Sequence, residues 1–143
     1  MGVDVFGIQP KSKVGSLFMN NWGAWRPLAN YSTAVAPDIT SGCRHWFFND
    51  GEGLAHQDAL ALAAVLKTEL SSGRALDYAR DHHTPFFRMR CITCRGIGCD
   101  RLDVCPDCDG KRYIQSDELR YFFVENMEHF TEFLQDSGGF KIW

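Results

Sequence analysis

Two cysteine pairs constrain the fold of this chain more than any other feature of its sequence. Cys91 and Cys94 form one Cys-x-x-Cys pair, and Cys105 and Cys108 form a second pair ten residues further along. Zinc takes four such ligands tetrahedrally, and two intervening residues allow a tight turn to direct both sulfurs of a pair at one point. Glycines follow each pair, and glycine adopts the positive φ angles that such turns require. The spacing therefore predicts that these four cysteines bind one zinc ion.

A zinc ion with four protein ligands has no open coordination position, so we expect it to be structural rather than catalytic. It would hold together a zinc-stapled hairpin inserted over residues 88–114, a segment with few core-forming side chains. Two alternatives stay open: an iron–sulfur cluster in place of zinc, and Cys99 as a spare ligand. A thioredoxin-like motif does not fit, because it has a single pair at the start of a helix.

Hydrophobic patterning predicts an α+β fold around this insert. The chain has 143 residues, 45% of them hydrophobic, which is typical of a single folded domain over residues 1–143. We expect a small sheet built from the two chain ends and packed by helices. The expected strands cover residues 3–6, 121–124 and 140–143; the expected helices run from Asn20 or Asn21 through Leu28, over 56–70, over 74–81, and from Glu125 or Asn126 to Gly138; residues 11–20 are expected to be loop.

The N-terminal segment predicts the compartment. It lacks the basic region and apolar run of a secretory signal, and no stretch reaches the roughly 18 to 20 apolar residues that cross a bilayer. We therefore expect a cytoplasmic protein with no membrane partner. In a reducing compartment, paired cysteines bind metals more often than they form disulfides, which agrees with the zinc prediction.

Residues 91–112 resemble a known zinc-binding repeat. The pattern Cys-x-x-Cys-x-Gly-x-Gly is similar to the cysteine-rich repeat of DnaJ-type chaperones. Those chaperones carry four repeats and two zinc ions, whereas this chain has two repeats, enough for one ion. It also has Arg112 where the repeat has glycine, and it has no J-domain signature. The resemblance therefore implies the mode of zinc binding and not the chaperone function.

A second resemblance covers most of the chain and is to a family of bacterial and bacteriophage proteins, whose members often carry a similar paired-cysteine insert. It implies a phage or prophage protein in a bacterial cytoplasm, and it carries no activity with it. Small phage proteins often bind and redirect or inhibit a host protein. The matching segments are Met1-Gly2-Val3-Asp4-Val5 with Gly7 and Pro10, Trp25-Arg26-Pro27-Leu28, Asn49-Asp50-Gly51 with Gly53 and Leu54, Val124-Glu125-Asn126, and Phe133-Leu134 with Ser137-Gly138-Gly139-Phe140.

The charge balance argues against nucleic acid as the main partner. The whole chain has a net charge of −3, and duplex DNA-binding proteins normally present a clearly basic face. Residues 88–112 hold six basic and four acidic side chains, and a zinc bound by four thiolates contributes −2, so the insert is close to neutral. Nucleic-acid binding stays an alternative, because the acidic side chains could point away from one basic face.

An enzymatic function is the further alternative, with a site in the region from His45 to Asp58. The sequence has no phosphate-binding loop, nucleophile elbow or zinc-protease motif, so no catalytic residue is assigned. An enzyme would require several candidate side chains to converge on one pocket. These candidates are His45, Asp50, Glu52, His56, Asp58, His82 and His83.

The remaining interpretation is a non-enzymatic, zinc-containing protein-interaction module that binds and modulates or inhibits a host protein, for example one of defence or replication. Aromatic residues make up 13% of the chain, and tryptophan and arginine dominate interface hot spots. We expect Trp22, Trp25 and Arg26 to form an interaction surface if they are exposed. The opposing expectation is that large aromatic residues in a small domain build its core.

Overall fold

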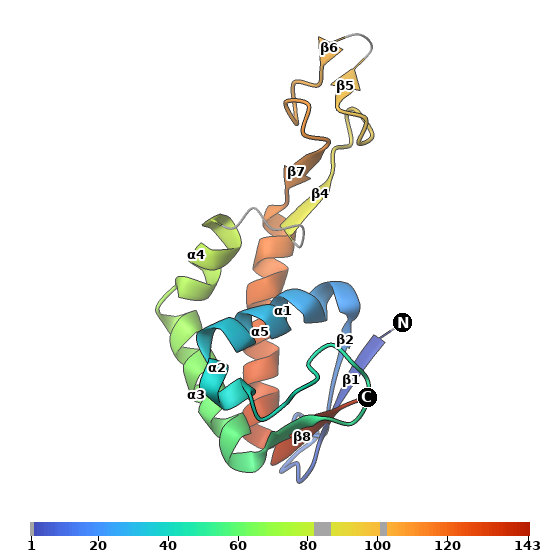
Figure 1. Cartoon of the computed structure of the whole chain (residues 1–143). Coiled ribbons are helices and arrows are strands. Elements are labelled where there is room, and N and C mark those ends of the chain that lie inside the picture. The colour runs from blue at the N-terminus through green and yellow to red at the C-terminus, as the bar shows by residue number, and fades with distance from the viewer. Residues whose placement is uncertain (1, 82–86, 101–102) are drawn as a thin grey trace.

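The computed structural model describes residues 2–81, 87–100 and 103–143 and has the expected α+β fold. The helices are α1 (Trp22–Val35), α2 (Pro37–Thr40), α3 (His56–Ser71), α4 (Arg74–Asp81) and α5 (Asp117–Asp136). The strands are β1 (Gly2–Gly7), β2 (Leu17–Asn21), β3 (Gly53–Ala55), β4 (Arg88–Arg90), β5 (Cys99–Asp100), β6 (Asp103–Val104), β7 (Tyr113–Gln115) and β8 (Gly139–Ile142). Strands β4 to β7 project away from everything else (Figure 1). We call residues 88–115 the arm and the other described residues the body.

The body contains a four-stranded antiparallel sheet in the order β2-β1-β8-β3, which joins the two ends of the chain as expected. Asp4 N–H donates to the Trp143 carbonyl at 2.8 Å, and Trp143 N–H donates to the Asp4 carbonyl at 2.7 Å. Strand β2 lies in a segment that the sequence predicted as loop, and β3 was not predicted. Neither strand contains a β-branched residue, so both depend on pairing with their neighbours rather than on local propensity.

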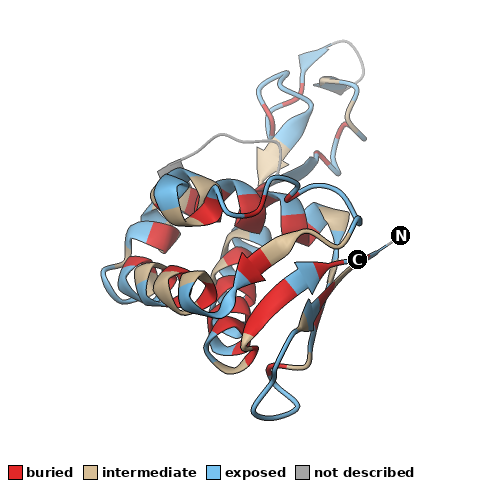
Figure 2. Ribbon diagram, turned by 60° about the horizontal axis from the view of Figure 1, so that its bottom comes forward, coloured by how far each residue is buried: buried red, intermediate tan, exposed pale blue. Residues whose placement is uncertain are grey.

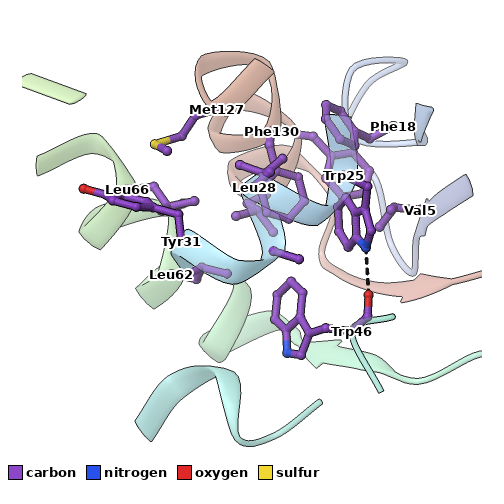
Figure 3. Packing of buried hydrophobic residues seen from close by; sticks show 14 of the residues in the cluster. Val5, Phe18, Trp25, Leu28, Tyr31, Trp46, Leu62, Leu66, Met127 and Phe130 are labelled. Carbon is purple, nitrogen blue, oxygen red and sulfur yellow. Dashed lines mark hydrogen bonds between the residues drawn. The ribbon is translucent and has the colours of Figure 1, made fainter. Parts of the chain in front are cut away.

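The helices cover one face of this sheet, and the core lies between them. Val3 and Val5 of β1 are fully buried whereas Phe6 is 42% exposed, because alternate side chains of a strand point to opposite faces. Phe130 of α5 packs edge-on against Trp25, with ring centroids 5.5 Å apart. Figure 2 shows buried positions concentrated where the helices meet the sheet, and Figure 3 shows the packing of Phe130 with its neighbours.

Helix α1 begins at the predicted position, because the Asn21 side chain accepts a hydrogen bond from Ala24 N–H at 2.9 Å and caps the first turn. Trp25 is fully buried in this helix, and its indole N–H donates to the Trp46 carbonyl at 2.7 Å (Figure 3). The expectation that Trp25 belongs to an interaction surface is therefore wrong. Its ring fills the space between α1, α5 and the segment around Trp46, as the core interpretation required.

Helix α5 is longer than the sequence predicted. The segment Tyr121–Val124, expected as a strand, lies inside it, and the helix begins at Asp117 instead of near Glu125. The Ser116 hydroxyl caps the helix by accepting a hydrogen bond from Leu119 N–H at 3.2 Å. Two acidic residues in the first turn stabilise the helix further, because their negative charge lies at the positive end of the helix dipole. The aromatic run resembles a strand locally, but the cap and the tertiary packing make it helical.

Polar contacts tie the remaining helices together. The Tyr31 hydroxyl of α1 donates to Glu69 of α3 at 2.5 Å, and the Arg74 guanidinium at the start of α4 donates to the same carboxylate at 2.8 and 3.0 Å. The hydrogen bonds from Arg74 lower the pKa of Glu69, whereas burial and the Glu69 carboxylate raise the pKa of Tyr31. Helices α3 and α4 both lie where the sequence predicted them. Among the described residues, no helix has the length and apolar character needed to cross a bilayer.

Candidate metal centre

The stem of the arm is an antiparallel ladder of β4 and β7, in which Arg88 pairs with Gln115 and Arg90 pairs with Tyr113. One further bond extends the ladder into the body, from Ser116 N–H to the Phe87 carbonyl at 2.8 Å. The stem therefore continues directly into α5 on one side (Figure 1). This ladder closes the predicted hairpin at its base.

Beyond the stem, the two cysteine segments form matching halves offset by 14 residues. Cys91 N–H donates to the Arg112 carbonyl at 3.0 Å, and the equivalent Cys105 N–H donates to the Gly98 carbonyl at 3.2 Å. Thr93 contacts Asp107, the residue at its own position in the other half. The arm tip is therefore a pair of repeats related by an approximate two-fold axis, each supplying two cysteines.

The backbone conformations of the two halves also match. Gly96 and Gly110 have φ angles of 77° and 72°, and Arg95 and Asp109 have φ angles of 52° and 49°. Arg112 occupies the position of Gly98 and also adopts a positive φ, 73° against 93°. A non-glycine residue in this region costs roughly 1–2 kcal/mol. The departure from the glycine pattern at Arg112 therefore strains the second half without changing its shape.

The four sulfur atoms come together at the centre of the arm. Their ligand atoms all lie within 4.8 Å of one another, with Cys91 Sγ 3.9 Å from Cys105 Sγ and Cys94 Sγ 3.7 Å from Cys108 Sγ. A tetrahedron of sulfurs about 2.3 Å from a central zinc has edges of roughly 3.8 Å. All four side chains are at most 5% exposed. The chemistry, spacing and burial of this group fit a metal ion.

Electrostatics within the cluster favour at least one thiolate. Burial opposes ionisation of Cys94, but hydrogen bonds from the Gly98 and Gly96 N–H groups and from neighbouring thiols outweigh it and lower its pKa. The Gly98 N–H lies 3.3 Å from the Cys94 sulfur. Burial and the surrounding thiols raise the pKa of Cys108. Four such groups in one buried space need a cation before all of them ionise.

The other two cysteines lie apart from this cluster. Cys99 is exposed on β5 and does not belong to the group of four, so the structure does not bring it in as a spare ligand. Cys43 is buried in the body, and burial raises the pKa of its thiol to about 11. A thiol with so high a pKa is a poor nucleophile near neutral pH.

The proposed interaction surface on α1 is reduced to two residues. Arg26 is exposed, and its guanidinium lies 5.8 Å from the centre of the Trp22 ring. Trp22 itself is only partly exposed, because it packs against the core. With Trp25 buried, Trp22 and Arg26 make a small patch.

The enzyme candidates form surface pairs. His45 contacts Asp50, and both side chains are exposed, at 45% and 39%. Desolvation raises the pKa of Asp50, but the hydrogen bonds from His45 and from the Glu52 N–H together outweigh it, so the net shift of this pKa is downward. Glu52 pairs with Arg44 at 2.7 Å, which lowers the pKa of Glu52. Both pairs lie in one turn at the surface of the body.

The remaining enzyme candidates lie in α3 or outside the described residues. His56 and Asp58 lie in the first turn of α3, where the negative charge of Asp58 suits the helix dipole. His82 and His83 lie outside the described residues. A cavity of about 250 Å³ in the described part of the chain is lined by other, mainly apolar residues, among them Phe87 and Phe122.

Sequence reasoning missed one feature of the arm, which is the side chains on a single face of its stem. Arg88, Lys111, Tyr113 and Gln115 line one open depression, and the Arg88 guanidinium lies 4.9 Å from the centre of the Tyr113 ring. The alternation Arg-Met-Arg could have indicated a strand with both arginines on one side.

Comparisons with protein-family models, curated proteins and solved structures find no match to this chain.

Proposed function

We propose that this protein is a non-enzymatic protein-interaction module whose arm, held by one structural zinc ion, docks on a partner protein. The observation that carries the proposal is the form of the arm. It projects from the body (Figure 1), its buried cluster consists of four cysteines, and it exposes large apolar side chains. These exposed residues are Ile92 (74%), Ile97 (62%) and Val104 (64%).

Zinc is the metal that fits best. Four thiolates in a closed tetrahedral set are a structural zinc site, and the closed shell leaves no position at which the metal could act on a substrate. The arm needs the ion for folding, because Ile114 is the one apolar side chain among the described residues that packs against the cysteine cluster. An iron–sulfur cluster uses the same ligands and is the competing occupant.

The apolar side chains at the tip support a protein partner. Ile92, Ile97 and Val104 are each more than half exposed on the projecting arm, and exposed apolar surface is a mark of interaction sites. The metal cluster holds the backbone beneath them in one conformation, so binding costs little ordering of the arm. The partner proposed from the resemblance is a bacterial host protein, for example of defence or replication, which a phage or prophage accessory protein in the cytoplasm modulates or inhibits.

The test is native mass spectrometry of the protein recovered from bacterial lysate at moderate salt. The proposal predicts a species containing the chain, one zinc ion and one defined protein. The Ile92→Asp variant, which leaves every cysteine in place, should retain zinc and lose the partner. The control is Met19→Asp, a change at a 70% exposed apolar residue on the body sheet, which should retain both. Equal loss in both variants, or loss in neither, contradicts docking through the arm tip.

Nucleic-acid binding is the second candidate, and the basic residues of the arm stem favour it. Arg88 and Arg90 lie on β4, and Lys111 and Arg112 precede β7. Nucleic-acid binding predicts co-purified material that absorbs at 260 nm and is removed by high salt, because phosphate contacts release counterions. A protein partner predicts a complex that survives the same salt.

A further inference from the structure

The basic charge of the arm is confined to its stem. Residues 88–90 and 111–115 contain four basic residues and no acidic residue, whereas residues 91–110 contain two basic and four acidic residues. A metal ion with four thiolates makes the tip more negative still. On the body side, α5 begins with Asp117 and Glu118. The basic residues of the stem therefore lie between two negatively charged regions, the tip of the arm and the start of α5.

The hydrogen-bonding pattern of the stem places two arginines at an open strand edge. Cys91 N–H donates to the Arg112 carbonyl, and Ser116 N–H donates to the Phe87 carbonyl. These two bonds show which residue pairs of the β4–β7 ladder are hydrogen-bonded to each other. Because paired residues alternate along an antiparallel ladder, Met89 exchanges bonds with Ile114, and the backbone N–H and C=O groups of Arg88 and Arg90 point away from β7. Among the described residues, β7 is the one strand that pairs with β4, so these groups point to the edge of β4 that has no partner strand in that part of the chain, and we call it the free edge.

The side chains of the same two arginines share one face of the stem. Residues two apart on a strand point to the same side, roughly 6.6 Å apart along it. All three residues of β4 are exposed, and Tyr113 lies on this face opposite Arg90. An added strand would therefore meet the main-chain groups of both residues, and the Arg88 guanidinium, which lies over the Tyr113 ring of β7, would turn toward that strand to meet its charge.

We propose that an extended acidic segment of a partner protein, with carboxylates at alternate positions, adds as a strand to the free edge of β4. This inference rests on the proposed function and names the chemistry of the partner. The segment forms main-chain hydrogen bonds with Arg88 and Arg90, and its alternate carboxylates lie opposite their guanidinium groups. Opposite charges at directly facing positions stabilise cross-strand pairs, and strand addition of this kind is a recurrent mode of peptide recognition.

The charge distribution favours a peptide over nucleic acid at this edge. A phosphate backbone that ran along the arm would leave the basic stem and meet the acidic residues of the tip, such as Asp103, or those of α5. A peptide with two or three carboxylates needs only the stem. The sugar–phosphate backbone of nucleic acid also has no amide groups with which to continue a β-ladder.

The test is fluorescence anisotropy with synthetic probes on the zinc-loaded full chain. The first probe is a labelled peptide with glutamate at alternate positions and valine or threonine between them. The matched probes are a peptide of the same composition with adjacent glutamates, the alternating peptide N-methylated on the amides that face β4, and a single-stranded oligothymidine. The alternating peptide should bind about tenfold more tightly than each of them, because the others lose the facing charges or the main-chain bonds.

Variants of the chain locate the binding site. The double change Arg88→Glu and Arg90→Glu should weaken the alternating peptide by about tenfold or more while the protein retains its zinc. Lys67→Glu, at an exposed basic residue of α3 in the body, is the control and should leave binding within about twofold of the unchanged chain.

Several outcomes overturn the inference. They are equal binding of the alternating and adjacent peptides, unchanged binding after N-methylation, tighter binding of the oligothymidine, and no binding of the peptide. Failure here is distinguishable from failure of the proposed function. If Ile92→Asp removes the partner while the stem variants keep it, the arm binds through its tip and only the strand addition is refuted.

Discussion

Replacing Cys105 by serine should release the metal and unfold the tip of the arm without unfolding the body. Cys105 is fully buried, and its sulfur lies 3.9 Å from that of Cys91. Structural zinc in small peptides contributes roughly 10–16 kcal/mol of apparent folding free energy. Divided evenly over four ligands, this is about 2.5–4 kcal/mol for each thiolate, which corresponds to zinc binding about 100- to 1,000-fold weaker.

The limited extent of unfolding follows from the separation of the two cores. The cluster of buried residues in the arm contains the four cysteines, and the described core of the body is a different set of residues. Loss of the metal removes the arm cluster, but Phe130 and its neighbours in the body keep their contacts. The body should therefore retain nearly its original melting temperature.

Hydrogen exchange read by mass spectrometry, together with a colorimetric zinc assay, measures both effects. Amides in residues 91–110, such as Gly98 N–H, should lose protection in Cys105→Ser, whereas α5 should keep its protection. Cys99→Ser is the matched control, because Cys99 is exposed and lies outside the cluster. Full zinc retention in both Cys94→Ser and Cys105→Ser would refute the four-cysteine site. Loss of protection throughout the body would refute the independence of the two cores.

Three further predictions concern the body. Phe130→Ala should lower the free energy of unfolding by about 3–5 kcal/mol in urea titration, because it empties a fully buried site among aromatic rings. Glu69→Gln should lower the free energy of unfolding by about 2 kcal/mol, because it removes the negative charge that accepts the hydrogen bonds from Arg74. Folding lowers the pKa of Glu69, so the stability that this carboxylate contributes should be present above pH 4 to 5 and should be lost as the pH falls below that range. Asp136→Asn should increase hydrogen exchange at Ser12, whose N–H and hydroxyl both donate to Asp136 at 2.9 and 2.6 Å, and unchanged exchange there would contradict this anchoring.

Local spacing was sufficient to predict the cysteine cluster, because each Cys-x-x-Cys turn fixes two sulfurs through backbone geometry over a few residues. The same local information predicted α3, whose apolar residues recur at helical spacing, and the Asn21 cap of α1. It also predicted a hairpin over residues 88–114, but it did not predict how the two strands of the stem pair. The pairing of Arg90 with Tyr113 joins residues that are far apart in sequence and depends on the whole intervening segment.

Errors arose where tertiary contacts outweigh local preference. The run around Phe122 and Phe123 is rich in aromatic residues and was predicted as a strand, yet it lies within α5. Phe123, Phe130 and Leu134 are all buried there, at the spacing of a helix that faces the core. Trp25 was ambiguous for a related reason, because composition does not distinguish a tryptophan at an interface from one in a core.

The most direct test of the metal-dependent arm is native mass spectrometry of the purified chain, expressed without added metal, before and after acid treatment. The account predicts a native mass equal to the chain plus one zinc ion, and the mass of the chain alone after acid. A native mass without metal, or one increased by iron and sulfide, would contradict a zinc ion bound by Cys91, Cys94, Cys105 and Cys108.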